Sequence, residues 1–349
     1  MGKRIVDLRS DTVTLPTPAM REAMYEAELG DDVMGEDPTV NRLEALAADK
    51  VGKEAALFVP SGTMGNLVSV LTHCQRGDEI IVGDEAHIFV YEVAGASAFG
   101  GVQIRLIPNQ RNGMLDPQKV LEAIRGEDIH LPPTRLVCLE NTHNRCGGCV
   151  LSPEQMDSIC VPVRERGIAV HLDGARIFNA AVSLGVEAKE LTGNVDSVMF
   201  CLSKGLCAPV GSLVASSEEF IRRARKNRKM LGGGMRQAGV LAAAGIVALT
   251  EMVDRLEEDH RNARILAEGL AEIVGLDVDL DTVQSDIVIF RVVSEKATAL
   301  QVQAALRTEG VKVSYYGGKL MRAVTHYGIE EDDIRYALGA FEKVMGGRA

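Results

Sequence analysis

The stretch Ile168-Ala-Val-His-Leu-Asp-Gly-Ala-Arg176 decides the fold class. A short apolar run of strand length leads directly into Asp173 and Arg176. The same arrangement recurs further along the chain, where Val198-Met-Phe-Cys-Leu-Ser-Lys204 carries an apolar run into a lysine. Short, nearly continuous apolar strands are typical of a parallel sheet that is covered on both faces.

Runs of this kind alternate with amphipathic segments over most of the chain. The predicted strands are Ala55–Val59, Glu79–Val82, Val102–Ile107, Leu136–Leu139, Ile168–Leu172, Val198–Leu202 and Gly211–Ala215. The segments between them have helical spacing, as in Thr63–His73, Pro117–Arg125 and Pro153–Arg166. Thr17-Pro18 predicts the start of an earlier helix. We therefore predict an α/β fold with a mostly parallel seven-stranded sheet covered by helices.

The pattern changes near residue 250. Apolar residues from Leu249 to Leu270 line one face of a segment that carries many charges, which predicts one long helix. Further strands are predicted at Asp286–Val292, Lys312–Tyr315 and Leu320–Val324, and helices at Lys296–Thr308 and Glu331–Val344. We expect a large domain over residues 1–250, including the N-terminal segment, and a smaller α+β domain over residues 251–349.

Composition excludes several classes of function. The chain has 349 residues, 46% of them hydrophobic, and a net charge of −11, which argues against binding to nucleic acid. Its longest uncharged apolar stretch, Val240–Leu249, is too short to cross a membrane, and no secretion signal is expected. The seven cysteines are odd in number and scattered, which favours reduced thiols and a cytoplasmic location.

Polar residues follow the predicted strands, where open α/β sheets bind their ligands. Ser61-Gly62-Thr63, His87, Asp173 and Lys204 each come shortly after an apolar run. Each also has an ordinary structural explanation. Ser61-Gly62-Thr63 and Asp173 fit helix caps, His87 fits a loop histidine and Lys204 fits a surface lysine. Together they supply what pyridoxal 5'-phosphate needs: a helix N-terminus for its phosphate, a flat group on the ring, a carboxylate for the ring nitrogen and an amine for the Schiff base.

Seven further segments, in order along almost the whole chain, carry a resemblance to a known family. The sequence resembles the low-specificity L-threonine aldolases, which are fold-type I pyridoxal-phosphate enzymes, at Asp7–Thr12, Gly30–Val33, Gly35–Thr39, His171–Arg176, Ser203–Leu206, Gly232–Gln237 and Arg322–His326.

The resemblance implies roles for the residues around the cofactor. Lys204 would form the internal aldimine, Asp173 would pair with the pyridine nitrogen, and His87 would stack on the ring. The phosphate would be held by Ser61, Gly62 and Thr63 of the same subunit, and by Lys229 and Arg236 of a neighbouring one.

The resemblance also implies a homotetramer, built as a dimer of dimers, with active sites shared between subunits.

The resemblance implies a substrate site as well. Ser10, Arg176 and Arg322 would hold the α-carboxylate of an amino acid, and Arg176 would also border the cofactor. Arginine suits a carboxylate because its fork of donors matches the two oxygens. His130 corresponds to the second imidazole of the family, near the β-hydroxyl. The sequence leaves open whether His87 or His130 removes the hydroxyl proton.

The activity implied is retro-aldol cleavage of L-threonine, L-allo-threonine and related β-hydroxy-α-amino acids to glycine and an aldehyde, and the reverse addition. Two alternatives from the same fold are a β-eliminating lyase and an enzyme like serine hydroxymethyltransferase. A folate enzyme would cleave serine faster with tetrahydrofolate. A third alternative is a non-catalytic protein that keeps the fold, against which the intact Lys204 and Asp173 argue.

Met34 and the pair Cys146 and Cys149 stand apart from this pattern. Many family members carry a tyrosine where this chain has Met34, so the role of that hydroxyl is lost or replaced. Cys146-Gly-Gly-Cys149 has the spacing of half a zinc site, but no second pair with suitable spacing accompanies it. We interpret these cysteines as free thiols on a turn and expect no metal.

Overall fold

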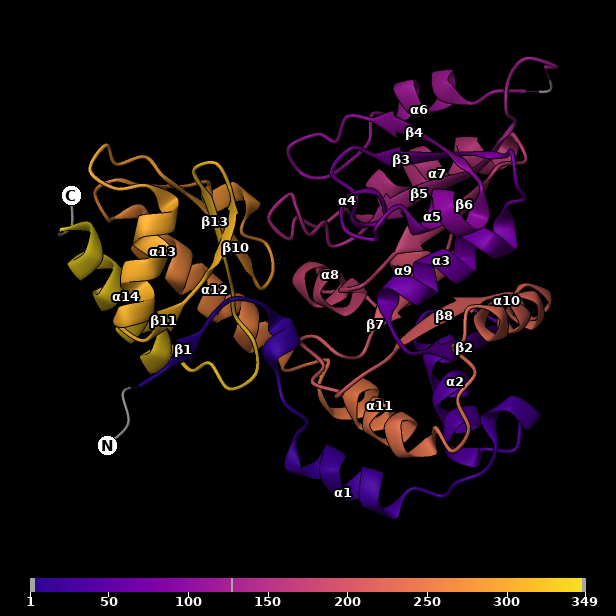
Figure 1. The fold of residues 1–349 in the computed structure, drawn as a ribbon, viewed down its shortest axis with the longest axis horizontal. Coiled ribbons are helices and arrows are strands. Elements are labelled where there is room, and N and C mark those ends of the chain that lie inside the picture. Colours follow the sequence, from indigo (N-terminus) through magenta and orange to yellow (C-terminus); the bar gives the residue numbers. More distant parts are fainter. Residues whose placement is uncertain (1–3, 127, 347–349) are drawn as a thin grey trace.

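A seven-stranded sheet forms the centre of the computed structural model, which describes residues 4–126 and 128–346. Its strand order is β2-β8-β7-β6-β5-β3-β4 (Figure 1). The strands from β4 to β7 pair in parallel, whereas β8 runs antiparallel to both of its neighbours. The bounds are β2 Ala55–Val59, β3 Glu79–Gly83, β4 Gln103–Ile107, β5 Thr134–Glu140, β6 Ala169–Asp173, β7 Ser197–Cys201 and β8 Ser212–Ser216. The predicted α/β fold and mostly parallel sheet are confirmed.

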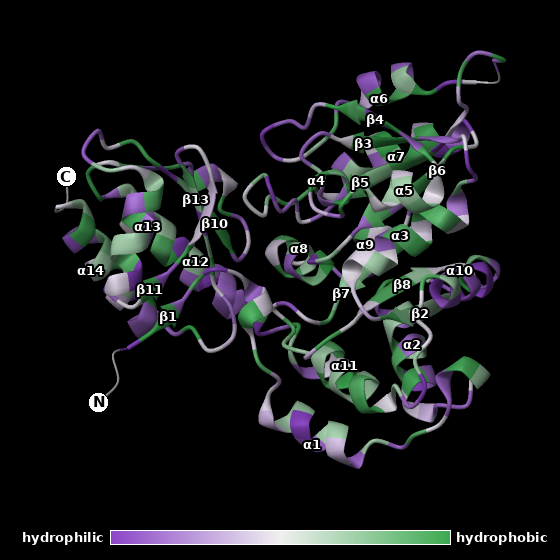
Figure 2. Cartoon of the chain, in the orientation of Figure 1, coloured by the Kyte–Doolittle hydropathy of each residue, from purple (hydrophilic) through white to green (hydrophobic). Residues whose placement is uncertain are grey.

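Both faces of this sheet are buried at its central strands, which explains their continuous apolar runs. In β7, Val198 and Phe200 pack into the core on one face, and Met199 and Cys201 pack into the core on the other. Figure 2 shows apolar residues along the central strands and polar residues on the outside of helix α10. Because neighbouring side chains of a strand point to opposite faces, a strand covered on both sides has to be apolar throughout.

Helices cover the two faces. Helices α2, α7, α8 and α11 contribute to one core, and α3 and α10 to those on the other face. The predicted cap at Thr17 is present, since its hydroxyl accepts a hydrogen bond from the backbone N–H of Met20. The helices of this unit are α1 Pro18–Glu26, α2 Pro38–Lys50, α3 Gly62–His73, α4 His87–Val90, α5 Gly95–Gly100, α6 Pro117–Ala123, α7 Pro153–Glu165, α8 Ile177–Leu184, α9 Ala188–Thr192, α10 Glu218–Met230 and α11 Gly239–Glu251, with 3-10 turns η1 Asp11–Val13 and η2 Asp32–Met34.

A smaller unit with its own core lies beside the large one (Figure 1). Its antiparallel sheet has the order β12-β13-β10-β9. Strand β1, near the N-terminus, pairs in parallel with β11, so the N-terminal segment belongs to the same unit as the last part of the chain. Its elements are β1 Val6–Asp7, α12 Leu256–Ala271, β9 Leu276–Val278, η3 Leu280–Thr282, β10 Ile287–Val292, α13 Ala299–Thr308, β11 Val311–Lys312, β12 Ser314–Gly317, β13 Leu320–Val324 and α14 Glu331–Met345. The division of the chain at residue 250 stays a prediction.

Two sequence predictions in this region are wrong. The long helix through Leu249 and Leu270 is two helices, α11 and α12, because its apolar residues serve different cores: Leu249 packs in the large unit and Leu270 in the small one. The strand predicted at Lys312–Tyr315 is likewise two, since β11 pairs with β1 and β12 pairs with β13. Among the described residues, no helix combines the length and the apolar character that crossing a membrane requires.

Candidate active site

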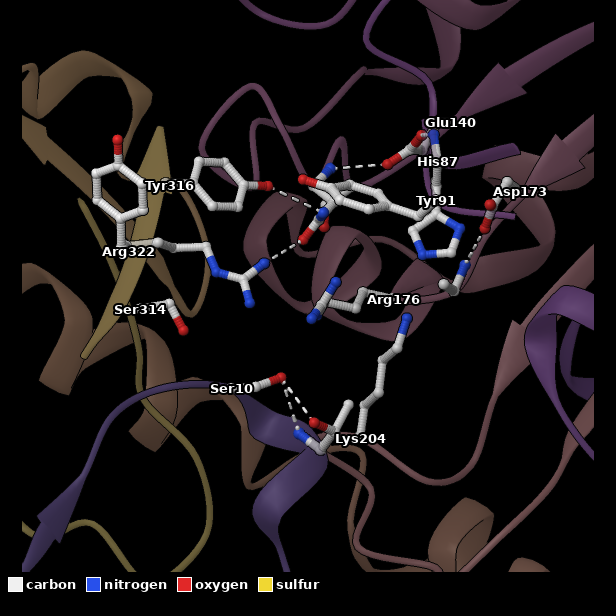
Figure 3. Close-up of a pocket in the computed structure, with 15 residues that line it drawn as sticks. Ser10, His87, Tyr91, Glu140, Asp173, Arg176, Lys204, Ser314, Tyr316 and Arg322 are labelled. Atoms are coloured by element: carbon white, nitrogen blue, oxygen red, sulfur yellow. Dashed lines mark hydrogen bonds between the residues drawn. The ribbon is translucent and has the colours of Figure 1, made fainter. Parts of the chain in front are cut away.

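A pocket of about 390 Å³ opens where the strands of the large sheet end, facing the small unit. The loops after β3, β5, β6 and β7 each contribute side chains to it, as the carboxyl ends of parallel strands are expected to do. The small unit closes the pocket with β12 and β13 (Figure 3). The lining residues are Ser10, Thr12, His87, Tyr91, Glu140, Thr142, Asn144, Asp173, Ala175, Arg176, Lys204, Ser314, Tyr315, Tyr316 and Arg322.

Lys204 follows β7 and extends into the middle of this pocket (Figure 3). Its backbone is anchored twice, because its carbonyl oxygen accepts hydrogen bonds from Thr14 Oγ1 at 3.0 Å and from the Cys207 N–H at 2.9 Å. The amine is therefore carried by a fixed stretch of chain, as a residue that must meet a ligand at one position requires.

Asp173 ends β6 at the inner side of the pocket and is only 4% exposed. Its Oδ2 accepts from Asn66 Nδ2 at 2.8 Å, and its Oδ1 accepts from the backbone N–H of Ala175 at 3.1 Å. Donors on both oxygens fix the direction of this carboxylate.

His87 begins helix α4 and lies near Asp173 (Figure 3). Its backbone N–H donates to Glu140 Oε2 at 2.7 Å, and its ring Nδ1 lies 2.9 Å from Glu92 Oε1. Burial lowers the pKa of His87, but the hydrogen bond to Glu92 and the nearby carboxylates outweigh it, so that the pKa is raised. The ring is thus a base of increased strength at the edge of the pocket.

Two arginines point into the same space from opposite sides (Figure 3). Arg176 is buried and donates through Nε and Nη2 to Asp11, at 2.7 and 2.8 Å. Burial alone would raise the pKa of Asp11, but the charge of Arg176 and its hydrogen bonds hold it well below the usual range. Arg322 of β13 donates to Asn144 Oδ1 at 2.8 Å and lies over the ring of Tyr316. Both cations are positioned for an anionic ligand.

Other predicted residues lie outside this pocket. Ser61 caps helix α3, since its Oγ accepts from the backbone N–H of Met64 at 3.2 Å, and it lines a different, mostly apolar pocket together with Thr63. His130 is exposed on a turn. Lys229 lies in the last turn of α10, and Arg236 forms an exposed ion pair with Asp31.

The two features set apart in the sequence also lie away from the lining. Met34 is 69% exposed on η2. Cys146 and Cys149 are free thiols, as predicted; Cys146 lies within a turn and Cys149 directly follows it.

Comparisons with known proteins decide the family. Residues 7–292 match the beta-eliminating lyase family. A probable low-specificity L-threonine aldolase 2 of Arabidopsis thaliana is 49% identical over 346 residues, which cover 98% of each chain. The low specificity L-threonine aldolase of Escherichia coli K12 is 48% identical over 330 residues, which cover 95% of this chain and 96% of the relative. This chain belongs to the low-specificity L-threonine aldolase family.

Solved structures share the fold of this threonine aldolase family member. A putative L-allo-threonine aldolase from Listeria monocytogenes superposes with a TM-score of 0.81 at 19% identity, over 98% of this chain and 97% of the other. A threonine aldolase of Leishmania major gives a TM-score of 0.82 at 18% identity, over 97% and 99%. A serine palmitoyltransferase from Sphingomonas wittichii gives 0.78 at 20% identity, over 97% and 87%.

Sequence reasoning missed the residues that support the site of this aldolase family member. Asp11 lies within Asp7–Thr12, a segment that carries the family resemblance. Nothing in the sequence indicated that Asp11 forms an ion pair with Arg176. Nothing in the local pattern marked Asn66 or Glu92, which are buried behind Asp173 and His87. Tyr91 and Tyr316 lie far apart in the sequence and meet only in the folded pocket.

Proposed function

We propose that this protein cleaves L-threonine, L-allo-threonine and related β-hydroxy-α-amino acids to glycine and an aldehyde, and catalyses the reverse addition, with pyridoxal 5'-phosphate as cofactor. The single observation that carries the proposal is the meeting of Lys204, Asp173 and His87 in one pocket. The name shared by relatives almost half identical over nearly the full chain supports the choice of reaction.

The residues present fit this cofactor. The pocket offers an amine on Lys204, a buried carboxylate with both oxygens held on Asp173, and the flat ring of His87. We assign the phosphate to the first turn of α3, where Gly62 and Thr63 follow the capping Ser61 and the helix N-terminus favours an anion. When bound, the cofactor supplies an electron sink for the pair released as the Cα–Cβ bond breaks.

We assign the substrate carboxylate to Arg322 and Arg176, with Ser10 beside them. Protein groups already hold both guanidinium groups: Nε and Nη2 of Arg176 donate to Asp11. Nη1 and Nη2 of Arg322 donate to Asn144 Oδ1 and to the Arg9 carbonyl oxygen, so we assign the carboxylate to the two arginines together. Asn144 and Tyr316 hold the Arg322 guanidinium toward the pocket, so that the amino acid binds with one orientation. A fixed carboxylate in turn fixes the position of the β-hydroxyl.

We assign the β-hydroxyl proton to His87, whose ring lines the pocket and whose pKa is raised. Removing this proton lets the hydroxyl carbon become the carbonyl carbon of the aldehyde as the Cα–Cβ bond breaks. His130 is exposed on its turn and borders no part of the pocket formed by the described residues of one chain.

We further propose that the protein is a homotetramer, a dimer of dimers, in which Lys229 and Arg236 reach the phosphate of the neighbouring subunit. Both lie near the exposed end of α10, close in sequence to Met230, which is 69% exposed. The side chains of Lys229 and Arg236 are exposed and therefore accessible to a neighbouring subunit. The cytoplasmic location stays a prediction.

The proposal is tested by supplying the protein with pyridoxal phosphate and L-threonine or L-allo-threonine, and measuring acetaldehyde by its reduction with a dehydrogenase and NADH. We expect aldehyde from at least one of the two amino acids, and essentially none from Lys204→Ala. Lys229→Ala is an informative second variant, because it should weaken cofactor binding without removing the reactive amine. Equal turnover by Lys204→Ala and the unmodified protein would contradict the assignment.

A further inference from the structure

A chain of buried hydrogen bonds connects His87 with the carboxylate of Asp173. His87 Nδ1 lies 2.9 Å from Glu92 Oε1, and the same oxygen accepts from Asn66 Nδ2 at 2.7 Å. Asn66 Nδ2 also donates to Asp173 Oδ2 at 2.8 Å. Asn66 is fully buried and Glu92 is only 5% exposed, so these bonds are shielded from water. One amide thus bridges the carboxylate behind His87 and the carboxylate of the cofactor site.

His171 fixes the direction of this amide from behind. Its Nε2 lies 3.0 Å from Asn66 Oδ1, and its Nδ1 lies 2.8 Å from Ser197 Oγ. Burial lowers the pKa of His171 to about 4, so the ring is neutral and carries one proton at physiological pH. Because Asn66 directs its N–H groups at two carboxylates, its oxygen faces His171, and the proton of that ring is on Nε2.

The orientation of the Asn66 amide bears on the role that Glu92 Oε1 has in its hydrogen bond with His87 Nδ1. Oε1 of Glu92 accepts the N–H of Asn66 and is therefore an acceptor for His87 Nδ1 as well. An imidazole that donates through Nδ1 keeps its lone pair on Nε2. We propose that Glu92 is a positioning residue, which holds the proton of His87 on Nδ1 and so leaves Nε2 free to accept the β-hydroxyl proton of the substrate. This inference rests on the proposed function.

The charges around the pair determine the sign of its pH dependence. Burial lowers the pKa of His87, but Glu92, Asp173 and Glu140 raise it on balance. Burial raises the pKa of Glu92, and Asp173 adds to the effect, whereas the bonds from His87 and Asn66 oppose it. Titratable groups that face the pair are Asp173 of β6, Glu140 and Cys138 of β5, Tyr91 after α4, Arg176 after β6 and Lys204 after β7.

His87 acts as a base only above its pKa, so kcat/KM should fall as the pH drops through that raised value. Replacing Glu92 with a neutral residue removes the closest negative charge and lowers the pKa of His87. The acid limb of the pH profile should then move to lower pH.

Two substitutions separate the effect of the negative charge of Glu92 from the effect of its oxygen as a hydrogen-bond acceptor. In Glu92→Gln the amide oxygen is held toward Asn66, which needs an acceptor, so Nδ1 keeps its proton. We expect the acid limb of kcat/KM to move down by about one pH unit, with KM within about threefold of the unmodified value. Glu92→Leu removes the acceptor, and we expect kcat to fall by about a hundredfold.

Glu44→Gln is the matched control. Glu44 is also a buried carboxylate with a pKa raised by burial, but it bonds the Phe58 N–H and Arg225, away from the pocket. We expect the acid limb of the kcat/KM profile of Glu44→Gln to coincide with that of the unmodified protein.

A second readout does not depend on turnover. In holoprotein labelled with ¹³C in its histidine rings, the signal missing from His87→Gln identifies His87, and its titration gives the pKa directly. We expect this pKa to fall in Glu92→Gln and to stay unchanged in Glu44→Gln.

An unmoved acid limb and an unmoved His87 titration in Glu92→Gln would overturn the proposal, as would unchanged kcat in Glu92→Leu. If Glu92→Leu does not fold, the acid limb and the His87 titration of Glu92→Gln decide whether the proposal holds. Absence of glycine formation by the unmodified protein would refute the proposed function instead, while the titration of His87 would still report on Glu92.

Discussion

Asp173 gains its character from the groups that surround it. Asn66 and the Ala175 N–H each donate to one of its oxygens, which fixes the carboxylate where the ring nitrogen of the cofactor is expected. Arg176 likewise donates to both oxygens of Asp11, and its charge outweighs the effect of burial, so that the pKa of Asp11 is lowered.

Asp173→Asn should keep the cofactor and lose turnover. A neutral amide preserves the shape and can still accept from Asn66, but it no longer favours the protonated ring nitrogen. We expect kcat to fall by about a hundredfold or more, with the visible absorbance of the bound cofactor retained. Steady-state kinetics at saturating cofactor measure this. Turnover within a few-fold of the unmodified protein would show that the carboxylate has only a structural role.

Arg322→Lys should weaken substrate binding more than it slows the reaction. A lysine keeps the charge but loses the fork of donors that meets a carboxylate, together with the contact with Tyr316. We expect KM for L-threonine to rise about tenfold or more, since a charge-assisted bidentate contact contributes about 1.5–3 kcal/mol. Arg291→Lys, on the neighbouring strand β10 and outside the pocket, is the matched control and should leave KM unchanged. Similar KM values for both variants would count against the assignment.

Single residues differed in how far the sequence could predict them. Lys204, Asp173 and His87 stand just after apolar strands, and topology brings strand ends together, so their meeting in the pocket follows from the pattern. Asn66 and Glu92 could not be predicted, because their contact depends on how α3 packs behind β6 and on the course of the loop after α4. Arg322 was indicated by the family resemblance alone.

At the level of elements, apolar runs predicted strands well wherever both faces are covered. β2 occupies the predicted residues, and the others differ only at their ends. The prediction failed between α11 and α12, where one apolar stripe continues across a break. Periodicity records that residues are buried, but it does not record in which core they are buried. The break between α11 and α12 could therefore not be predicted from the apolar pattern.

Ser61→Ala tests the assignment of the phosphate to helix α3. Loss of the cap should cost about 1 kcal/mol of stability and weaken cofactor binding, because the first turn would no longer be fixed. Ser152→Ala removes a comparable cap from α7, away from the pocket, and serves as the control. We expect both to lower the unfolding temperature of the cofactor-free protein, and only Ser61→Ala to raise the Kd for pyridoxal phosphate. An equal Kd in the two variants would place the phosphate elsewhere.

At the level of the whole molecule, the N-terminal segment packs with the last part of the chain. Strand β1 pairs with β11, and Asp11, just after β1, holds Arg176 of the large unit. The pocket therefore depends on contacts between segments that are remote in sequence, which no local pattern predicts. Lys229 and Arg236 lie outside the pocket of their own chain, and their assigned role requires a second copy.

Mixing two inactive variants tests whether sites are shared. In a hybrid of Lys204→Ala and Arg236→Ala subunits, one of the two sites of a dimer combines an intact Lys204 with an intact Arg236. We expect about a quarter of the unmodified activity to return after equal amounts have reassorted. A mixture of Lys204→Ala with Asp173→Asn should stay inactive, since both residues belong to the same chain's site. No recovery in samples shown by native mass spectrometry to contain hybrids would place Arg236 outside a shared site.

Cleavage of the bond between Cα and Cβ in this pocket is tested by carbon-13 NMR of the products formed from uniformly labelled L-threonine. Cleavage yields two-carbon products, glycine and acetaldehyde, in equal amounts, whereas β-elimination, the reaction named by the wider family, yields the four-carbon 2-oxobutanoate and ammonia. We predict glycine in which both carbons remain coupled, and no four-carbon acid. Labelled 2-oxobutanoate in place of glycine would show that the protein eliminates the β-hydroxyl group instead of breaking the bond between Cα and Cβ.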